Sequence, residues 1–299
     1  MGDTRGGGPT GAAAGIPTRV LVLGMARDDG SIAAADLAPV ATACGLSPEQ
    51  VRSCLRRLVG EGLFVRDGEG RQAVYRPTAE RRAARRTEAG RGRRAYAQDR
   101  ADQAWDGRWH LVAFAVPESR RSARDALRER LGALGGAAVQ NGLYVSPHAW
   151  EKDVLAQAER LDLAEQITLA TSGDLTVGGE SDPVRLARRL WPVDDLARRY
   201  QAFVDEWGGV PDELARRQAG QAGLSDGSFV AGGLAMGVAF LACYETDPLL
   251  PPELLPRPWP GREARRLVVR SRARALGLRA GDDRPGLFRS FDALIDALR

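Results

Sequence analysis

The 299-residue sequence has few of the residues that usually hold metal ions or carry nucleophilic catalysis. It contains two histidines and three cysteines, and the cysteines form no CxxC pair. The phosphate-binding pattern GxxxxGK[ST] and the zinc-peptidase pattern HExxH do not occur in it. We therefore expect no metal site, no cofactor and no enzymatic activity.

Long apolar runs are also scarce. The longest, Phe229 to Cys243, is rich in glycine and shorter than the about 20 residues that span a bilayer. Residues 1–16 are rich in glycine and alanine and lack the apolar stretch of a signal peptide, so we interpret them as a flexible tail. Together these features predict a cytoplasmic protein without membrane contact. The cysteines are then expected to be small buried hydrophobic residues in a reducing compartment, namely Cys44, Cys54 and Cys243.

Lysine is almost absent, since Lys152 is the only one, and arginine carries the positive charge. The net charge of +4 is modest, but arginines cluster strongly between residues 79 and 104. Such a cluster suits a phosphate backbone, and it also suits a solvated linker helix. The clustered residues are Arg81, Arg82, Arg85, Arg86, Arg91, Arg93, Arg94 and Arg100.

Residues 17–78 have the pattern of a winged helix-turn-helix. Two short helical segments, 18–26 and 36–44, precede the sequence Ser47-Pro48-Glu49-Gln50, which predicts a capping box with proline at the first helical position. The helix that follows is expected to extend to about Gly62. Strands 63–66 and 73–76 then flank an Asp-Gly step that favours a hairpin.

One face of the third helix has the chemistry to read DNA. Arginine pairs with guanine O6 and N7, and glutamine pairs with adenine, when they project from the first turns of a helix. The face opposite the apolar residues is basic, whereas a winged helix used only for protein contacts is the alternative. The candidate DNA-binding residues are Gln50, Arg52, Ser53, Arg56 and Arg57 on the helix and Arg66, Arg71 and Arg76 on the hairpin.

Beyond the basic segment 79–104, residues 105–182 predict a small α+β sandwich of ferredoxin type. Strands are expected at 109–116, 137–145 and 166–171, with helices at 119–131 and 150–161 between them. Residues 183–299 predict a helical domain for effector binding and dimerisation. Its expected helices are 193–207, 214–222, 230–245, 262–276 and 290–299.

A small-molecule site is expected between the central and C-terminal domains, because domain interfaces often bind ligands. The candidates combine cations for phosphates with rings for an aryl group, and each of them also suits a core or surface role. Asp106 and Glu118 bracket the first central strand, where a metal-dependent nuclease would place carboxylates, but two-metal chemistry needs more ligands than these. The effector candidates are Arg108, Trp109, His110 and Trp191.

The segment that begins WDGRWHLVAFAVPE and ends NGLYVSP resembles the central block of the PaaX family, repressors of phenylacetate catabolism. Near the C-terminus, DPLLPPELLPRPWPG resembles a second segment of that family. The resemblance implies a winged helix-turn-helix, a central domain similar to the Cas2 fold and a helical C-terminal domain. It also implies a homodimer that binds a palindromic double-stranded operator and is released by an acyl-CoA such as phenylacetyl-CoA.

The sequence departs from this family at Leu134-Gly135-Gly136-Ala137, where the family has an aromatic residue in a GFG-like turn. If that turn shapes a pocket, the effector differs from phenylacetyl-CoA. A PaaX-like regulator that answers to a non-CoA ligand or a protein partner is therefore one alternative. A Cas2-like metal-dependent nuclease is the other.

Overall fold

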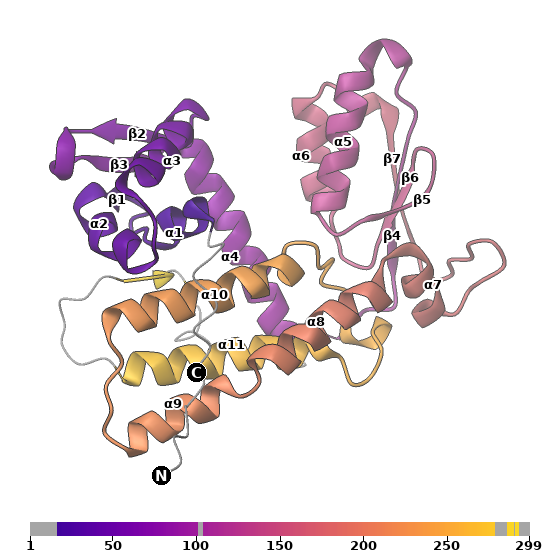
Figure 1. The fold of residues 1–299 in the computed structure, drawn as a ribbon. Helices are drawn as coiled ribbons and strands as arrows, with labels where there is room; N and C mark the ends of the chain where they lie inside the picture. Colours follow the sequence, from indigo (N-terminus) through magenta and orange to yellow (C-terminus); the bar gives the residue numbers. More distant parts are fainter. Residues whose placement is uncertain (1–16, 101–103, 279–285, 290, 293–299) are drawn as a thin grey trace. The chain divides into compact units, whose positions relative to one another are not determined.

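The computed structural model describes residues 17–100, 104–278, 286–289 and 291–292. It is a mixed α+β protein whose contacts divide it into two compact units. The first unit contains residues 1–93, 203–242 and 263–299, and the second contains residues 94–202 and 243–262 (Figure 1). The five-part division expected from the sequence stays a prediction, as does the flexible tail at 1–16, which lies outside the described residues.

The first unit begins with three helices and a β-hairpin. The helices are α1 (Thr18–Gly24), α2 (Ala34–Ala43) and α3 (Pro48–Gly60), and the hairpin strands are β2 (Phe64–Asp67) and β3 (Val74–Pro77). A two-residue strand, β1 (Ile32–Ala33), adds to the hairpin and gives the antiparallel order β1-β3-β2. This strand is too short to leave an alternating pattern in the sequence.

The predicted capping box starts α3. The hydroxyl oxygen of Ser47 accepts a hydrogen bond from the backbone N–H of Gln50 at 3.2 Å, and Gln50 Oε1 accepts one from the N–H of Ser47 at 2.8 Å. Val51, Leu55 and Leu58 are buried along the inner face of this helix. The cap therefore fixes where α3 begins, and the apolar face fixes which side of it remains exposed.

The core around these helices also contains residues from far along the chain. Phe229 and Leu234 of α10 (Asp226–Tyr244) are buried with Leu21 and Leu58 in one hydrophobic cluster, which Leu287 joins. The other helices that contribute to the first unit are α4 (Ala79–Asp99), α8 (Val193–Trp207), α9 (Val210–Ala219) and α11 (Pro260–Gly277).

The described part of the C-terminal segment is fixed in the first unit by polar and aromatic contacts. Arg272, which is 8% exposed, donates hydrogen bonds to both carboxylate oxygens of Asp292 at 2.7 and 2.8 Å and to the carbonyl of Leu287. The ring of Phe288 lies where a Cβ on Gly24 would be 2.7 Å from it, so glycine on α1 makes room for this ring. Phe288 thus packs against α1, while Leu287 and Asp292 are held by Arg272 of α11.

α10 is long and apolar enough, by length and composition, to cross a membrane, and this corrects the expectation that the segment is too short. One such helix is weak support for a membrane span. The structure gives it another role, because Phe229, Val230 and Leu234 fill the core of the first unit. Its apolar character is therefore accounted for in part by packing within the protein.

The second unit contains a four-stranded antiparallel sheet with two helices on one face. Its strands and helices follow the order β4 (Trp109–Phe114), α5 (Arg121–Ala133), β5 (Ala137–Gln140), β6 (Leu143–Ser146), α6 (Glu151–Arg160) and β7 (Ile167–Ser172). The strand order β5-β6-β4-β7 is that of the ferredoxin-like arrangement. Val112, Leu127, Leu131 and Val154 are fully buried in its core.

The single strand expected at 137–145 is wrong. The structure has two strands, β5 and β6, joined at Asn141-Gly142. An Asn-Gly pair favours a tight hairpin turn because both residues tolerate positive φ. Gly142 has φ +75°, and a Cβ there would lie 2.4 Å from the carbonyl oxygen of Phe114.

The helices after residue 183 are largely where the sequence predicts them. α7 (Pro183–Leu190) is an addition, and its start has a clear signal, since Asp182 caps it and Pro183 takes the first position. α9 begins at Val210, four residues before the expected start, because Pro211 and two acidic residues suit a first turn. The helix expected at 290–299 lies outside the described residues, except for Phe291 and Asp292, which are helical.

Candidate nucleic-acid interface

The exposed face of α3 carries most of the residues expected to bind DNA. Arg52, Arg56 and Arg57 are exposed, and Ser53 is half-buried between them and the core. Gln50 is exposed as well, but its side-chain oxygen is occupied by the capping bond to Ser47. Bidentate recognition of adenine needs that same oxygen, so the cap competes with base reading by Gln50.

Glu49, which was not among the expected site residues, links two of these arginines. Its Oε2 accepts hydrogen bonds from Arg52 Nε at 3.1 Å and Nη2 at 2.8 Å, and its Oε1 accepts one from Arg56 Nη2 at 3.0 Å. The hydrogen bond and charge of Arg52, followed by those of Arg56, hold the pKa of Glu49 below its usual value of 4.5. Spacings of three and seven residues place all three side chains on one helical face, and this signal is visible in the sequence.

The hairpin next to α3 presents the other expected DNA-binding arginines. Arg66, Arg71 and Arg76 are all exposed, and Arg76 Nε donates to Asp67 across the two strands at 3.3 Å. A short 3₁₀ turn, Gly70–Gln72, forms the tip between the strands. Val65 on β2 is 61% exposed, which is unusual for a large apolar side chain.

The basic segment forms α4, and its arginines differ in their surroundings. Arg81 is half-buried and donates to Glu88 at 2.7 Å, and Arg82 donates to the carbonyl oxygen of Pro77 at the end of β3. Arg86 and Arg93 are exposed. The first turns of α4 are therefore tied to the hairpin, and its exposed arginines leave positive charge on the surface of the first unit.

The expected effector residues lie in the second unit. Trp109 and Trp191 are 1% and 5% exposed and stack with ring centroids 6.2 Å apart, so the structure brings these two together in the core. The Nδ1 of His110 lies 2.5 Å from Oε1 of Glu151, while Arg108 is exposed. The structure therefore leaves Arg108 as the member of this set that solvent can reach freely.

Comparison with protein-family models identifies the central and C-terminal parts of the chain. Residues 102–185 match the family described as the PaaX protein central Cas2-like domain. Residues 191–280 match the PaaX-like protein C-terminal domain, and the two spans cover more than half of the chain. The chain belongs to the PaaX family. Domains of this family are typically regulatory rather than catalytic, which indicates a regulator.

One solved structure, of an uncharacterized protein from Mycobacterium tuberculosis, has a similar fold. It is 22% identical, with a TM-score of 0.51, over 86% of this chain and 93% of that one. No curated protein matches the chain. The structural likeness therefore supports the fold alone.

The PaaX-family motifs of this chain hold the second unit together. In the WDGRW segment, Asp106 Oδ1 accepts a hydrogen bond from the N–H of Arg108 at 2.9 Å, and Trp105 packs edge-on against Trp109. In the DPLLP segment, the buried Asp247 accepts a hydrogen bond from the Tyr200 hydroxyl at 2.8 Å. Both segments serve packing in this structure.

His148, which follows the NGLYVSP motif, connects it to the DPLLP segment. Its Nε2–H donates to the carbonyl oxygen of Leu249 at 2.7 Å, and the Gln98 amide donates to the same oxygen at 2.9 Å. Burial, followed by the nearby charge of Arg94, lowers the pKa of His148 from 6.5 to about 4. The ring is therefore neutral at physiological pH and acts as a structural donor.

The turn that lacks the family's aromatic residue has a packing explanation. A Cβ on Gly136 would lie 2.2 Å from the ring of Trp150, and the carbonyl of Gly135 accepts a hydrogen bond from the Trp191 indole at 3.0 Å. The space beside Gly136 is thus filled by Trp150 from elsewhere in the chain.

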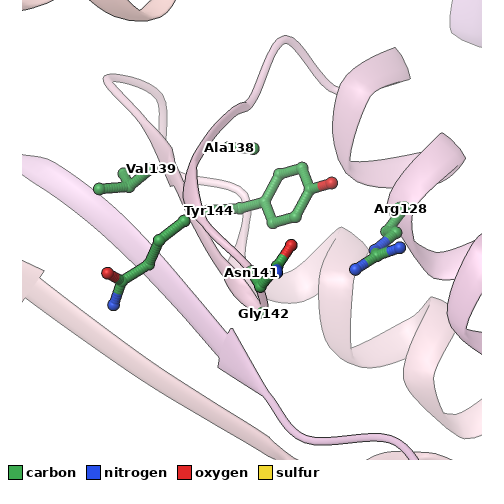
Figure 2. A pocket seen from close by; sticks show the side chains of 7 residues that line it. Arg128, Ala138, Val139, Asn141, Gly142 and Tyr144 are labelled. Carbon is green, nitrogen blue, oxygen red and sulfur yellow. The ribbon is translucent and has the colours of Figure 1, made fainter.

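A shallow hollow of about 370 Å³ lies where α5 meets the β5–β6 hairpin (Figure 2). None of the four expected effector residues lines it. The Arg128 guanidinium and the Asn141 and Tyr144 side chains give it hydrogen-bonding groups. The lining residues are Arg128, Ala138, Val139, Gln140, Asn141, Gly142 and Tyr144.

One segment fits a nucleophile pattern. Gly223 to Gly227 reads GLSDG and so matches GxSxG. In the structure the Ser225 hydroxyl accepts from the N–H of Ser228 at 3.2 Å at the start of α10, and the two hydroxyls lie 2.9 Å apart. A nucleophile elbow joins a strand to a helix, whereas this segment follows α9, so we interpret Ser225 as a helix cap.

The cysteines are buried, as the sequence predicts, and burial raises the pKa of all three thiols. Within the described residues, no group of three or more His, Cys, Asp or Glu side chains is arranged to hold a metal ion.

Proposed function

We propose that this chain is a transcriptional regulator that binds double-stranded DNA through a winged helix-turn-helix formed by residues 17–78. The observation that carries the proposal is the capped helix α3, whose outward face presents Arg52, Arg56 and Arg57 beside a hairpin with exposed arginines. A helix of this kind fits the major groove, and an adjacent hairpin reaches the backbone or the minor groove.

Within this proposal, the position of each α3 residue along the helix determines whether it contacts bases or phosphates. Arg52 and Ser53 lie in the opening turns and read base edges, while Arg56 and Arg57 lie deeper along the helix and meet phosphates. Arg66, Arg71 and Arg76 contact the backbone from the hairpin. Gln50 contributes mainly through the cap that orients α3.

We further propose that the protein acts as a homodimer on a palindromic operator and is a repressor released by an effector. The proposed effector is the one that the resemblance to PaaX repressors implies, an acyl-CoA such as phenylacetyl-CoA. Arg108 is the expected effector residue best placed to meet phosphates. Trp109, His110 and Trp191 are engaged with neighbouring groups, so they influence an effector only through the fold around it.

Substituting Arg52 by alanine is expected to weaken DNA binding by about 1–3 kcal/mol at a single base position, because a bidentate arginine discriminates guanine from other bases by that amount. The measurement is fluorescence anisotropy with duplexes that carry each base at each operator position. A loss spread evenly over all sequences would show instead that Arg52 contacts phosphate.

Arg57→Ala is the matched control for this experiment. Arg57 is exposed on the same helix, and the structure shows no ion pair for it among the described residues. It is expected to weaken binding about equally for all sequences and to reduce the dependence of affinity on salt by about one counterion.

A further inference from the structure

The feature that carries an additional inference is the ionised Glu49 on the face of α3 proposed to enter the DNA groove. A carboxylate at this position would face the DNA polyanion, and by its charge alone it weakens DNA binding. Its contacts indicate a further role, because both of its oxygens are paired with guanidinium groups, one from Arg52 and one from Arg56. Glu49 and Arg52 are 62% and 63% exposed in their side chains, so duplex DNA can reach the trio.

The geometry of the Glu49–Arg52 contact leaves the useful edge of the arginine available. Glu49 Oε2 accepts hydrogen bonds from Nε and Nη2, which form one lateral edge of the Arg52 guanidinium. The outer edge keeps two N–H groups side by side, one of Nη1 and one of Nη2. Guanine offers O6 and N7 to two donors side by side, and this outer edge supplies them.

The same contact makes Arg52 selective. A free arginine binds any phosphate strongly, whatever the base sequence, whereas an arginine already paired with a carboxylate gains less from a single phosphate. The trio of one carboxylate and two guanidinium groups carries a net charge of +1 in place of +2, which reduces attraction to any duplex regardless of its sequence. Specificity is the difference between the affinities for cognate and non-cognate DNA. A carboxylate that weakens the non-specific complex therefore raises specificity.

We propose that Glu49 is a specificity-determining residue, which positions Arg52 for guanine and suppresses binding to non-cognate DNA. This inference rests on the proposed function, because it needs α3 to bind DNA. Its role is positioning, since Glu49 acts through Arg52. The competing interpretation is that the ion pairs only stabilise the exposed helix, as pairs at this spacing often do.

The test begins with selection of duplexes from a randomised library by the wild-type protein and by Glu49→Gln. The glutamine has the same size and removes the charge, and circular dichroism checks that the helical content is unchanged. For Glu49→Gln we expect roughly three- to tenfold tighter binding to a scrambled duplex, with a salt slope steeper by about one. We expect the preference for the selected duplex over the scrambled one to fall about tenfold, because the guanine that Arg52 reads is no longer enforced.

A second variant separates positioning from a general effect of charge. In an Arg52→Ala background, Glu49→Gln is expected to leave base preference at that position unchanged, because no arginine remains to be positioned. Equal motifs and equal preference ratios for the wild type and Glu49→Gln would overturn the inference while leaving the proposed function intact. Failure of the wild-type protein to select any sequence would overturn both.

Discussion

Replacing Trp109 by alanine is expected to lower the free energy of unfolding by about 3–5 kcal/mol, because the indole fills the centre of a packed aromatic cluster. Trp109 is 1% exposed, stacks on Trp191 and receives the edge of Trp105 at a centroid distance of 5.0 Å. Alanine leaves a cavity between the sheet and the segments that cover it. The sequence alone places Trp109 among the effector candidates. The size of this loss in stability distinguishes a core role for Trp109 from a ligand-contacting role.

Urea unfolding followed by circular dichroism measures this loss without depending on tryptophan fluorescence. Leu155→Ala is the control, because Leu155 is on α6 of the same unit and is 43% exposed, so its removal is expected to change stability by no more than about 0.5 kcal/mol. A Trp109→Ala protein as stable as this control, but with weaker effector binding, would place Trp109 at a ligand surface.

Acidification is expected to destabilise the protein through His148 by up to about 3 kcal/mol between pH 6.5 and pH 4. In this window the unfolded chain binds a proton at His148, while burial and the charge of Arg94 keep the folded ring neutral. The unfolded state therefore binds more protons, so stability is complete above the unfolded pKa and falls as the pH drops towards 4. The charges of His110 and Asp106 also affect the pKa of His148, the first lowering it and the second raising it.

The control for this prediction is His148→Gln, which retains a donor for the Leu249 carbonyl and removes the titrating group. Its urea midpoint is expected to change much less between pH 6.5 and pH 4.5 than that of the wild-type protein. The carboxyls whose pKa is lowered, such as Glu180 at about 2, lose their contribution only at pH values below about 4.5, so they act outside this range. An equal slope in both proteins would show that other groups cause any acid sensitivity.

The sequence was most informative where local chemistry dictates structure. Ser47 and Gln50 define the start of α3 because a capping box needs only residues three positions apart, and the structure confirms both of its hydrogen bonds. The α+β character and the central domain follow from hydrophobic periods and from motifs such as WDGRW. One strand error arose at Asn141-Gly142, a turn signal inside a largely apolar segment, and the two-residue strand β1 was missed because it is too short to leave a pattern.

The parts that could not be predicted depend on contacts between distant segments. No local pattern indicates that Leu287 enters the core formed by α1 and α3, or that His148 meets the Leu249 carbonyl 101 residues away. The burial of Trp109 against Trp191 is of the same kind, and it moves two expected effector residues into the core. In contrast, the Glu49–Arg52–Arg56 arrangement obeys helical spacing and was open to prediction from the sequence.

The central claim, that this PaaX-family protein is a DNA-binding regulator, is tested most directly by fluorescence anisotropy with promoter DNA from upstream of its own gene. The titration is made at two salt concentrations, with and without phenylacetyl-CoA. We predict tight binding to this duplex over a scrambled one, affinity that falls with salt, and release by the thioester. DNA binding that is unchanged by the thioester would support the role of regulator and exclude phenylacetyl-CoA as the effector. Equal binding of both duplexes, or none, would contradict the claim.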